Sequence, residues 1–276
     1  MDFLPLIPII LLFVFFFLKI PVAYSMLIST LVYFMFINTT MPVDEVVQRL
    51  VASTESFPYL AIPFFACAGV IFNYSGITNR LMGLAEALVG HVKGGLGQVN
   101  VLLSALMGGL SGSSNADAAM QTKVLVPEMV KLGYSKGFSL VVTASSSCIT
   151  PIIPPGIVLI LYAVAADVSI AKMFYAGYIP GLIIMFALMI AVDIIARRRN
   201  YAPSREKRME FVPFLKLVLK AIWALFLPFG ILMGLRIGMF TPTEAGAISV
   251  VYALFVGAFI YRELKLKDIP KILVES

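Results

Sequence analysis

Long apolar runs dominate the chain and alternate with short polar or charged segments. Most of these runs are close to the roughly 20 residues with which an α-helix crosses the hydrocarbon core of a bilayer. The pattern therefore predicts an all-α, polytopic transmembrane protein. Uninterrupted spans are expected at Phe3–Leu18, Pro21–Ile37, Tyr59–Tyr74, Phe174–Ala196, Ala221–Leu235 and Thr243–Tyr261.

The composition excludes a soluble fold. Hydrophobic residues make up 60% of the 276 residues and charged residues only 13%. This apolar surface exceeds what one soluble core can bury. The first apolar run follows Asp2 without a basic segment and lacks a small-residue cleavage site, so we expect a retained helix and not a secretory signal.

The basic residues lie in loops beside the predicted spans, which is how membrane proteins encode their orientation. If Met1 is outside, only Arg49, Lys172 and Arg236 of the 21 Lys and Arg residues fall in outer loops. We therefore expect the N-terminus on the outer side. Because this placement accounts for the net charge of +6, we expect no nucleic-acid partner.

A polar run of small residues, 108–119, interrupts the apolar sequence between Lys93 and Lys136. It carries Asp117, and a carboxylate at membrane depth is expensive enough to indicate a functional site. Once the Gly and Ser residues are set aside, neither flanking segment is long enough to cross a bilayer. We therefore predict a re-entrant helix-turn-helix at about 94–131, opening inward, with its tip buried in protein or lining a water-filled cavity.

A second interruption follows at residues 145–156, where three prolines remove backbone donors and a glycine further weakens the helix. It predicts one discontinuous helix at about 137–166, made of the half-helices 137–149 and 157–166. Secondary transporters build ion and substrate sites where such half-helices meet, because freed carbonyls bind a cation and helix N-termini face an anion.

The two interruptions together predict a Na⁺ site and an adjoining substrate site. Asp117 would either cap the second leg of the hairpin or tune the charge of the site. The predicted Na⁺ ligands are Gly109, Ser111, Gly112, Ser114, Asn115, Asp117, Ser147 and Thr150. The predicted substrate contacts are Ser113, Ser146, Pro151, Pro154 and Pro155.

Other interpretations of these motifs remain open. Gly-Ser runs also serve close helix packing, and prolines also produce a simple kink. The string Gly109-Leu110-Ser111-Gly112 is similar to the nucleophile motif of rhomboid intramembrane serine proteases. That chemistry needs a histidine base on a neighbouring helix, and the single histidine, His91, lies upstream in a basic loop.

Two proline-led helices indicate an internal duplication. Pro21 opens one predicted span and Pro242 another, and the orientation above directs the first outward and the second inward. Opposite directions are typical of an inverted-topology repeat. We therefore expect residues 1–210 to form the first repeat, ending in a basic cytoplasmic linker, and residues 211–276 to begin the second with two spans.

Three motifs carry a resemblance to a known family: Gly-Leu-Ser-Gly-Ser-Ser-Asn-Ala-Asp-Ala-Ala at 109–119, Thr-Pro-Ile-Ile-Pro-Pro at 150–155 and Phe-Thr-Pro-Thr-Glu-Ala-Gly-Ala at 240–247. With them the chain resembles the large membrane subunit of tripartite ATP-independent periplasmic (TRAP) transporters. The resemblance implies a Na⁺-driven, elevator-type importer of organic acids such as sialic acids or C4-dicarboxylates, in the bacterial inner membrane with a periplasmic N-terminus and without enzymatic activity. It also implies two protein partners, a small four-helix membrane subunit and a periplasmic substrate-binding protein.

The chain differs from this family in its length. Members are longer and carry a second hairpin and a second broken helix, so we expect this chain to supply one half of the site, either as a fragment or with the remainder elsewhere. Three alternatives remain: a Na⁺/carboxylate symporter without a binding protein, a non-transporting membrane scaffold and a rhomboid-like protease.

Overall fold

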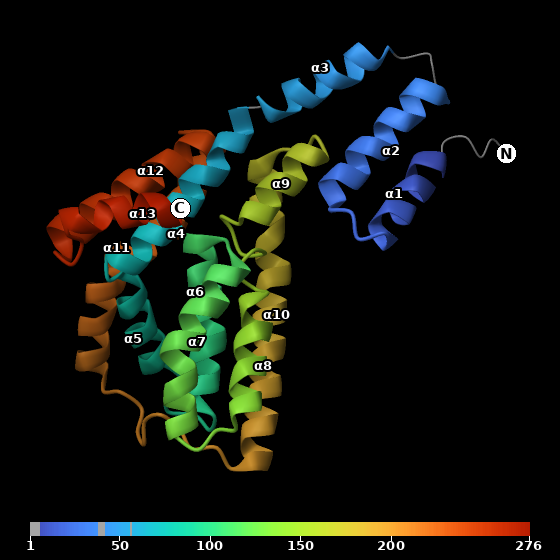
Figure 1. Cartoon of the computed structure of the whole chain (residues 1–276). Coiled ribbons are helices and arrows are strands. Elements are labelled where there is room, and N and C mark those ends of the chain that lie inside the picture. Colours follow the sequence, from blue (N-terminus) through green and yellow to red (C-terminus); the bar gives the residue numbers. More distant parts are fainter. Residues whose placement is uncertain (1–5, 38–41, 56) are drawn as a thin grey trace. The chain divides into compact units, whose positions relative to one another are not determined.

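The computed structural model describes residues 6–37, 42–55 and 57–276, and within these ranges every regular element is helical. The chain divides into two compact units, residues 1–56 and 57–276 (Figure 1). This confirms the predicted all-α class. The division concerns packing, so the predicted repeat boundary at 210/211 stays a prediction.

The first unit holds three helices: α1 (Ile7–Phe17), α2 (Val22–Phe36) and α3 (Val43–Thr54). α1 and α2 pack against each other, and Pro21 occupies the N-cap position of α2. They are 11 and 15 residues long. Residues 3–5 of the predicted span 3–18 lie outside the described residues, and α2 is two residues shorter than the predicted span 21–37. Lys19 adopts a φ of 62° between them, so the helices cannot extend toward each other.

The second unit holds the remaining helices. In chain order they are a 3₁₀ turn Phe57–Leu60, α4 (Ala61–Tyr74), α5 (Ile77–Val89), α6 (Gly95–Ser111), α7 (Ser114–Lys131), α8 (Lys136–Ser147), α9 (Ile157–Ala165), α10 (Ile170–Arg199), α11 (Phe211–Arg236), α12 (Pro242–Phe255), a π-helical turn Val256–Ile260, a 3₁₀ turn Leu266–Asp268 and α13 (Ile269–Glu275).

Within the described residues, four helical segments are long and apolar enough to cross a membrane: Phe57–Tyr74, Ile170–Arg199, Phe211–Arg236 and Pro242–Ile260. They cover four of the six predicted spans, apart from Tyr261 at the end of the last one. The outer face of α10 shows why these helices suit lipid, because it exposes an apolar stripe at helical spacing that includes Ile179, Ile183 and Ile190. The finding supports an integral membrane protein.

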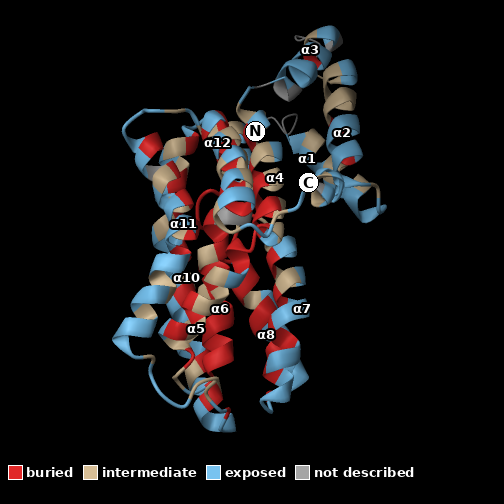
Figure 2. Ribbon diagram, turned by 90° about the vertical axis from the view of Figure 1, so that its left-hand side faces the viewer, coloured by how far each residue is buried: buried red, intermediate tan, exposed pale blue. Residues whose placement is uncertain are grey.

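α6 is the centre of the second unit. It contacts α4, α5, α7, α8, α10 and α11, and Figure 2 shows that buried residues concentrate in α5, α6 and α8. α6 tolerates so many neighbours because its small residues allow close approach. A Cβ on Gly109 would lie 2.8 Å from the Cβ of Pro228 in α11. Close packing is therefore one real use of the Gly-Ser run.

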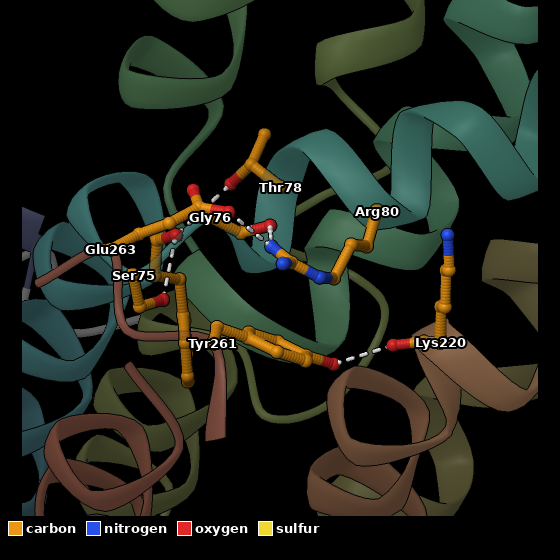
Figure 3. A network of polar contacts seen from close by, with 8 residues as sticks. Ser75, Gly76, Thr78, Arg80, Lys220, Tyr261 and Glu263 are labelled. Atoms are coloured by element: carbon orange, nitrogen blue, oxygen red, sulfur yellow. Dashed lines mark hydrogen bonds and ion pairs between the residues drawn. The ribbon is translucent and has the colours of Figure 1, made fainter. Parts of the chain in front are cut away.

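A polar network joins the start of α5 to α11 and to the segment that follows the π-helical turn (Figure 3). Arg80 pairs with Glu263 at 2.7 Å and donates to the carbonyl of Gly76 at 2.9 Å. Its guanidinium carbon lies 3.7 Å from the ring centroid of Tyr261, whose hydroxyl donates to the carbonyl of Lys220. The network fixes the corner between α4 and α5 against the last part of the unit.

Candidate ion and substrate site at the hairpin tip

The predicted hairpin is present as α6 and α7, which lie side by side (Figure 1). The turn between them is only two residues long. Gly112 adopts a φ of 58°, and Ser113 is extended and accepts a hydrogen bond from the amide of Ala116 at 3.4 Å. This N-cap fixes the start of α7.

The legs are longer than predicted, because residues 108–111 continue α6 instead of joining the turn. Gly108 and Gly109 remain helical since they pack tightly on other segments: their Cβ atoms would lie 2.9 Å and 2.8 Å from side-chain atoms of Ile153 and Pro228. With 17 and 18 residues, each leg is about 25 Å long at the usual helical rise.

The predicted break is also present. α8 ends at Ser147 and α9 begins at Ile157, while residues 148–156 form turns without a continuous helix. These boundaries lie within two residues of the predicted half-helices 137–149 and 157–166. The break is more than a proline kink, because it separates two distinct helices.

The hairpin tip packs directly against the break. A Cβ on Gly112 would lie 2.8 Å from the carbonyl oxygen of Pro155. Cβ atoms on Gly108 and Gly109 would each lie 3.2 Å from another carbonyl oxygen of the break, of Thr150 and Pro154 respectively. The C-terminal end of α6 therefore lies against a row of main-chain oxygens.

Asp117 does not cap α7; its side chain turns inward from the first turn of that helix. Oδ2 accepts hydrogen bonds from Ser104 Oγ at 2.7 Å and Thr150 Oγ1 at 3.1 Å, and Gln121 Nε2 donates to both carboxylate oxygens at 2.9 Å. We call Ser104, Asp117, Gln121 and Thr150 the Asp117 cluster. All four are buried, and among the described residues Asp117 is the only fully buried acidic one.

A second buried network lies between α6 and α8. Asn100 donates to Thr143 Oγ1 at 2.8 Å and accepts from Ser146 Oγ at 2.7 Å. The hydroxyl of Ser146, predicted to contact substrate, is thus bonded within the protein. Ser147 donates to the carbonyl of Ala144 at 3.0 Å.

The other predicted site residues differ in exposure. Asn115 is exposed; Ser113, Ser114 and Pro151 are half-buried. The side chain of Ser111 lies outside the described residues. The structure gathers the predicted set around one contact between tip and break, since the buried members are Gly109, Gly112, Asp117, Ser146, Ser147, Thr150, Pro154 and Pro155.

Sequence reasoning missed Asn100, Ser104, Gln121 and Thr143. A signal for them exists: Asn100 and Ser104 are four residues apart, as are Asp117 and Gln121. Polar residues at this spacing share one face of a helix, and in an apolar helix such a face indicates a polar contact with a neighbour.

An apolar groove of about 240 Å³ opens beside the tip, between α6, α10 and α11. Gly109, Pro154, Tyr178 and Pro228 contribute to its lining, which holds no charged side chain. Within the described residues there is also no group of three or more His, Cys, Asp or Glu side chains that could hold a metal ion.

The geometry removes the protease alternative. His91 precedes α6, and Ser111 ends it. The length of α6, about 25 Å, therefore separates the only histidine from the serine that it would have to activate.

Comparison with known proteins identifies the family. The sequence pattern of the DctM component of tripartite ATP-independent periplasmic transporters matches residues 9–276. The chain belongs to this TRAP transporter family. The predicted resemblance is confirmed.

Relatives within the TRAP family carry different substrate names. The chain is 38% identical to the sialic acid TRAP transporter permease SiaT of Haemophilus influenzae (strain 86-028NP), over 94% of this chain and 42% of that protein. It is 38% identical to the C4-dicarboxylate large permease DctM of Pseudomonas aeruginosa, over 83% of this chain and 53% of that protein. It is 40% identical to the 2,3-diketo-L-gulonate large permease YiaN of Escherichia coli, over 92% of this chain and 59% of that protein.

The chain spans about half the length of these TRAP relatives. These relatives are named as transporter permeases. Their similar identities to this chain do not single out one substrate.

Proposed function

We propose that the chain is the membrane permease subunit of a Na⁺-coupled secondary transporter that imports an organic acid anion delivered by a periplasmic binding protein. One observation carries the proposal: the turn of the hairpin packs against the break in the α8–α9 helix, so that two helix C-termini and two helix N-termini meet.

The helix C-termini favour a cation. α6 ends at Ser111 and α8 at Ser147, and the C-terminal end of a helix carries partial negative charge. The carbonyls of residues 145–147 each accept one main-chain bond from residues 148–150 and keep a second lone pair. The carbonyls of the break add further oxygens. We assign Na⁺ to this contact, with Gly109, Ser111, Gly112, Ser114, Asn115, Ser147 and Thr150 as its ligands.

The helix N-termini favour an anion. α7 begins at Ser114 and α9 at Ile157, and the free amides of a first turn bind carboxylates. The substrates in the names of the relatives, sialic acid, C4-dicarboxylates and diketo-gulonate, share a carboxylate. We therefore propose a carboxylate near both N-termini, with Ser113, Ser146, Pro151, Pro154 and Pro155 as the surrounding residues.

Contacts at the base of the hairpin support the proposed topology. The amide of Gly94 donates to the carbonyl of Tyr201, and the hydroxyl of Tyr134 donates to that of Ala202 at 2.8 Å. Both ends of the hairpin thus contact the basic linker that follows α10. The last turn of α10 itself holds three arginines, residues 197–199. Basic loops favour the cytoplasm, so we propose a re-entrant hairpin that opens inward, a periplasmic N-terminus and an inner-membrane location.

The remaining parts of the proposal derive from the family. They are an elevator-type motion, an inverted second repeat, a small four-helix membrane subunit and the periplasmic binding protein. A Na⁺/carboxylate symporter without a binding protein would use the same broken helices, and a scaffold subunit would use them only for packing.

Uptake by proteoliposomes that contain the transporter assembled from this chain and its partner proteins tests the proposal. We expect a labelled organic acid to accumulate only when an inward Na⁺ gradient and the binding protein are both present. Accumulation without the binding protein would favour the simple symporter. The absence of uptake and of any Na⁺-dependent thermal shift, across a panel of sialic, dicarboxylic and sugar acids, would favour the scaffold.

A further inference from the structure

The Asp117 cluster joins three segments whose relative positions determine the geometry of the proposed ion site. Ser104 belongs to α6, Asp117 and Gln121 to α7, and Thr150 to the break. Thr150 Oγ1 contacts both Asp117 Oδ2 at 3.1 Å and the carbonyl of Ser104 at 3.3 Å. A single buried carboxylate therefore connects both legs of the hairpin to the broken helix.

We propose that Asp117 is a positioning residue, which fixes the broken helix to the hairpin through hydrogen bonds and does not need its negative charge to do so. The proposal rests on the proposed function in one respect: the register that Asp117 maintains is that of the Na⁺ site.

The contacts of Asp117 favour this role over direct binding of Na⁺. Its two oxygens accept four hydrogen bonds, from Ser104, Thr150 and twice from Gln121. Three of these bonds fall on Oδ2, which leaves that oxygen no free lone-pair site, and one falls on Oδ1. A cation at Oδ2 would have to displace one of these buried donors, and an unsatisfied buried donor is costly.

Thr150 shows how the cluster reaches the proposed site. Its hydroxyl belongs to the cluster, while its carbonyl oxygen faces α6 beside Gly108. The bond to Asp117 therefore determines where that carbonyl lies. If the bond is lost, the carbonyl moves away from its position at the hairpin.

The side chain of Gln121 shows how an amide at position 117 could take the place of the carboxylate. The Oε1 atom of Gln121 is buried and has no hydrogen-bond partner, while Nε2 makes all the contacts of the side chain. In Asp117→Asn, the new Oδ1 can accept from Ser104 and Thr150, and the new amide can donate to Gln121 Oε1 once the Gln121 amide rotates. The variant therefore keeps the hydrogen bonds that join α7 to α6 and to the break, without a charge.

Hydrogen exchange of the purified chain tests the positioning role without reference to transport. We expect the amides of residues 148–156 to exchange faster in Asp117→Ala and in Thr150→Val than in the parent, and at the parental rate in Asp117→Asn. Ser249→Ala is the matched control, because Ser249 is equally buried but donates within α12, to Ala245. Thr150→Val removes one hydroxyl at constant volume and covers the case in which Asp117→Ala fails to fold.

Na⁺-driven uptake by the assembled transporter then tests the consequence. We expect the Na⁺ concentration for half-maximal uptake to rise about tenfold in Thr150→Val and Asp117→Ala, the usual effect of losing a hydrogen bond to a charged group, and to stay near the parental value in Asp117→Asn. Asp117→Asn behaving like Asp117→Ala in both assays, or parental exchange in Asp117→Ala and Thr150→Val, would overturn the proposal. If the parent needs no Na⁺, the proposed function fails, while the exchange experiment still decides the role of Asp117.

Discussion

Gly109 and Gly112 stand three residues apart and meet different physical demands. Gly109 is helical and leaves room for Pro228, whereas Gly112 needs both a positive φ and space beside the carbonyl of Pro155. A side chain at position 112 is therefore strained by its own backbone as well as by its neighbour. Glycine is therefore required at both positions because another segment packs closely against each of them.

The substitution Gly112→Ala tests this demand. We expect a loss of about 1–2 kcal/mol in the free energy of unfolding from the left-handed backbone alone, and a larger loss from the contact with Pro155. Gly137→Ala is the matched control, since nothing lies within 4 Å of its Cβ position; we expect it to be neutral or stabilising. Equal melting temperatures for both variants in detergent would contradict this explanation.

Ser113 at the start of α7 leads to a second prediction. It is the N-cap of α7 and accepts from the amide of Ala116. Ser113→Ala removes the cap and should lower stability by about 1 kcal/mol, whereas Ser113→Asn should retain most of it. Thermal unfolding measures both. A stable Ser113→Ala variant together with an unstable Ser113→Asn variant would show that the side chain serves another purpose.

The sequence predicted the ends of some helices more accurately than those of others. The break between α8 and α9 was predicted within two residues, because three prolines exclude a regular helix wherever the rest of the chain lies. The hairpin turn was predicted too long, because the helical state of Gly108 and Gly109 depends on Ile153 and Pro228. Contacts between distant segments decide such positions, and local sequence does not contain them.

An aromatic cluster closes the base of the hairpin. Tyr201 of the linker stacks on Tyr134 with ring centroids 4.4 Å apart and lies 5.2 Å from Phe138. Its hydroxyl also bonds Ser135. The cluster connects the turn between α7 and α8 to the linker after α10, so we expect these elements to move together.

Replacement of Tyr201 separates the two contributions. Tyr201→Ala loses the stack as well as the hydrogen bonds and should cost about 3 kcal/mol, whereas Tyr201→Phe keeps the stack and should cost about 1 kcal/mol. Tyr162→Ala serves as the control, because Tyr162 is exposed on α9. The measurement is chemical unfolding together with hydrogen exchange of residues 131–136. Identical losses of unfolding free energy for Tyr201→Ala and Tyr162→Ala would contradict the view that the aromatic cluster holds the α7–α8 turn against the linker.

At the scale of the whole molecule, charge and apolar runs predicted most of the architecture. Four of six predicted spans are long apolar helices in the structure, and the basic linker lies at the base of the hairpin. The buried polar partners could not be predicted in the same way. Ser104 shares a helix face with Asn100, and Gln121 shares one with Asp117, but only the packing of α6 against α7 brings both faces to the same carboxylate.

The predicted orientation is testable with single cysteines. In a variant without Cys67 and Cys148, we expect Lys207→Cys to react with a membrane-impermeant maleimide only from the cytoplasmic side. Gly238→Cys, in the turn between α11 and α12, should react only from the periplasmic side. The reverse pattern in intact cells and inverted vesicles would refute the charge-based topology.

The central claim is that the tip of the hairpin and the break form a Na⁺ site that drives uptake of an organic anion. The most direct measurement is the Na⁺ concentration dependence of uptake into proteoliposomes by the assembled transporter, compared between the parent, Ser114→Ala and the control Ser249→Ala. We predict Na⁺-driven uptake in the parent and the control, and a clearly higher Na⁺ requirement or no uptake in Ser114→Ala. Normal uptake and unchanged Na⁺ dependence in Ser114→Ala would contradict the claim.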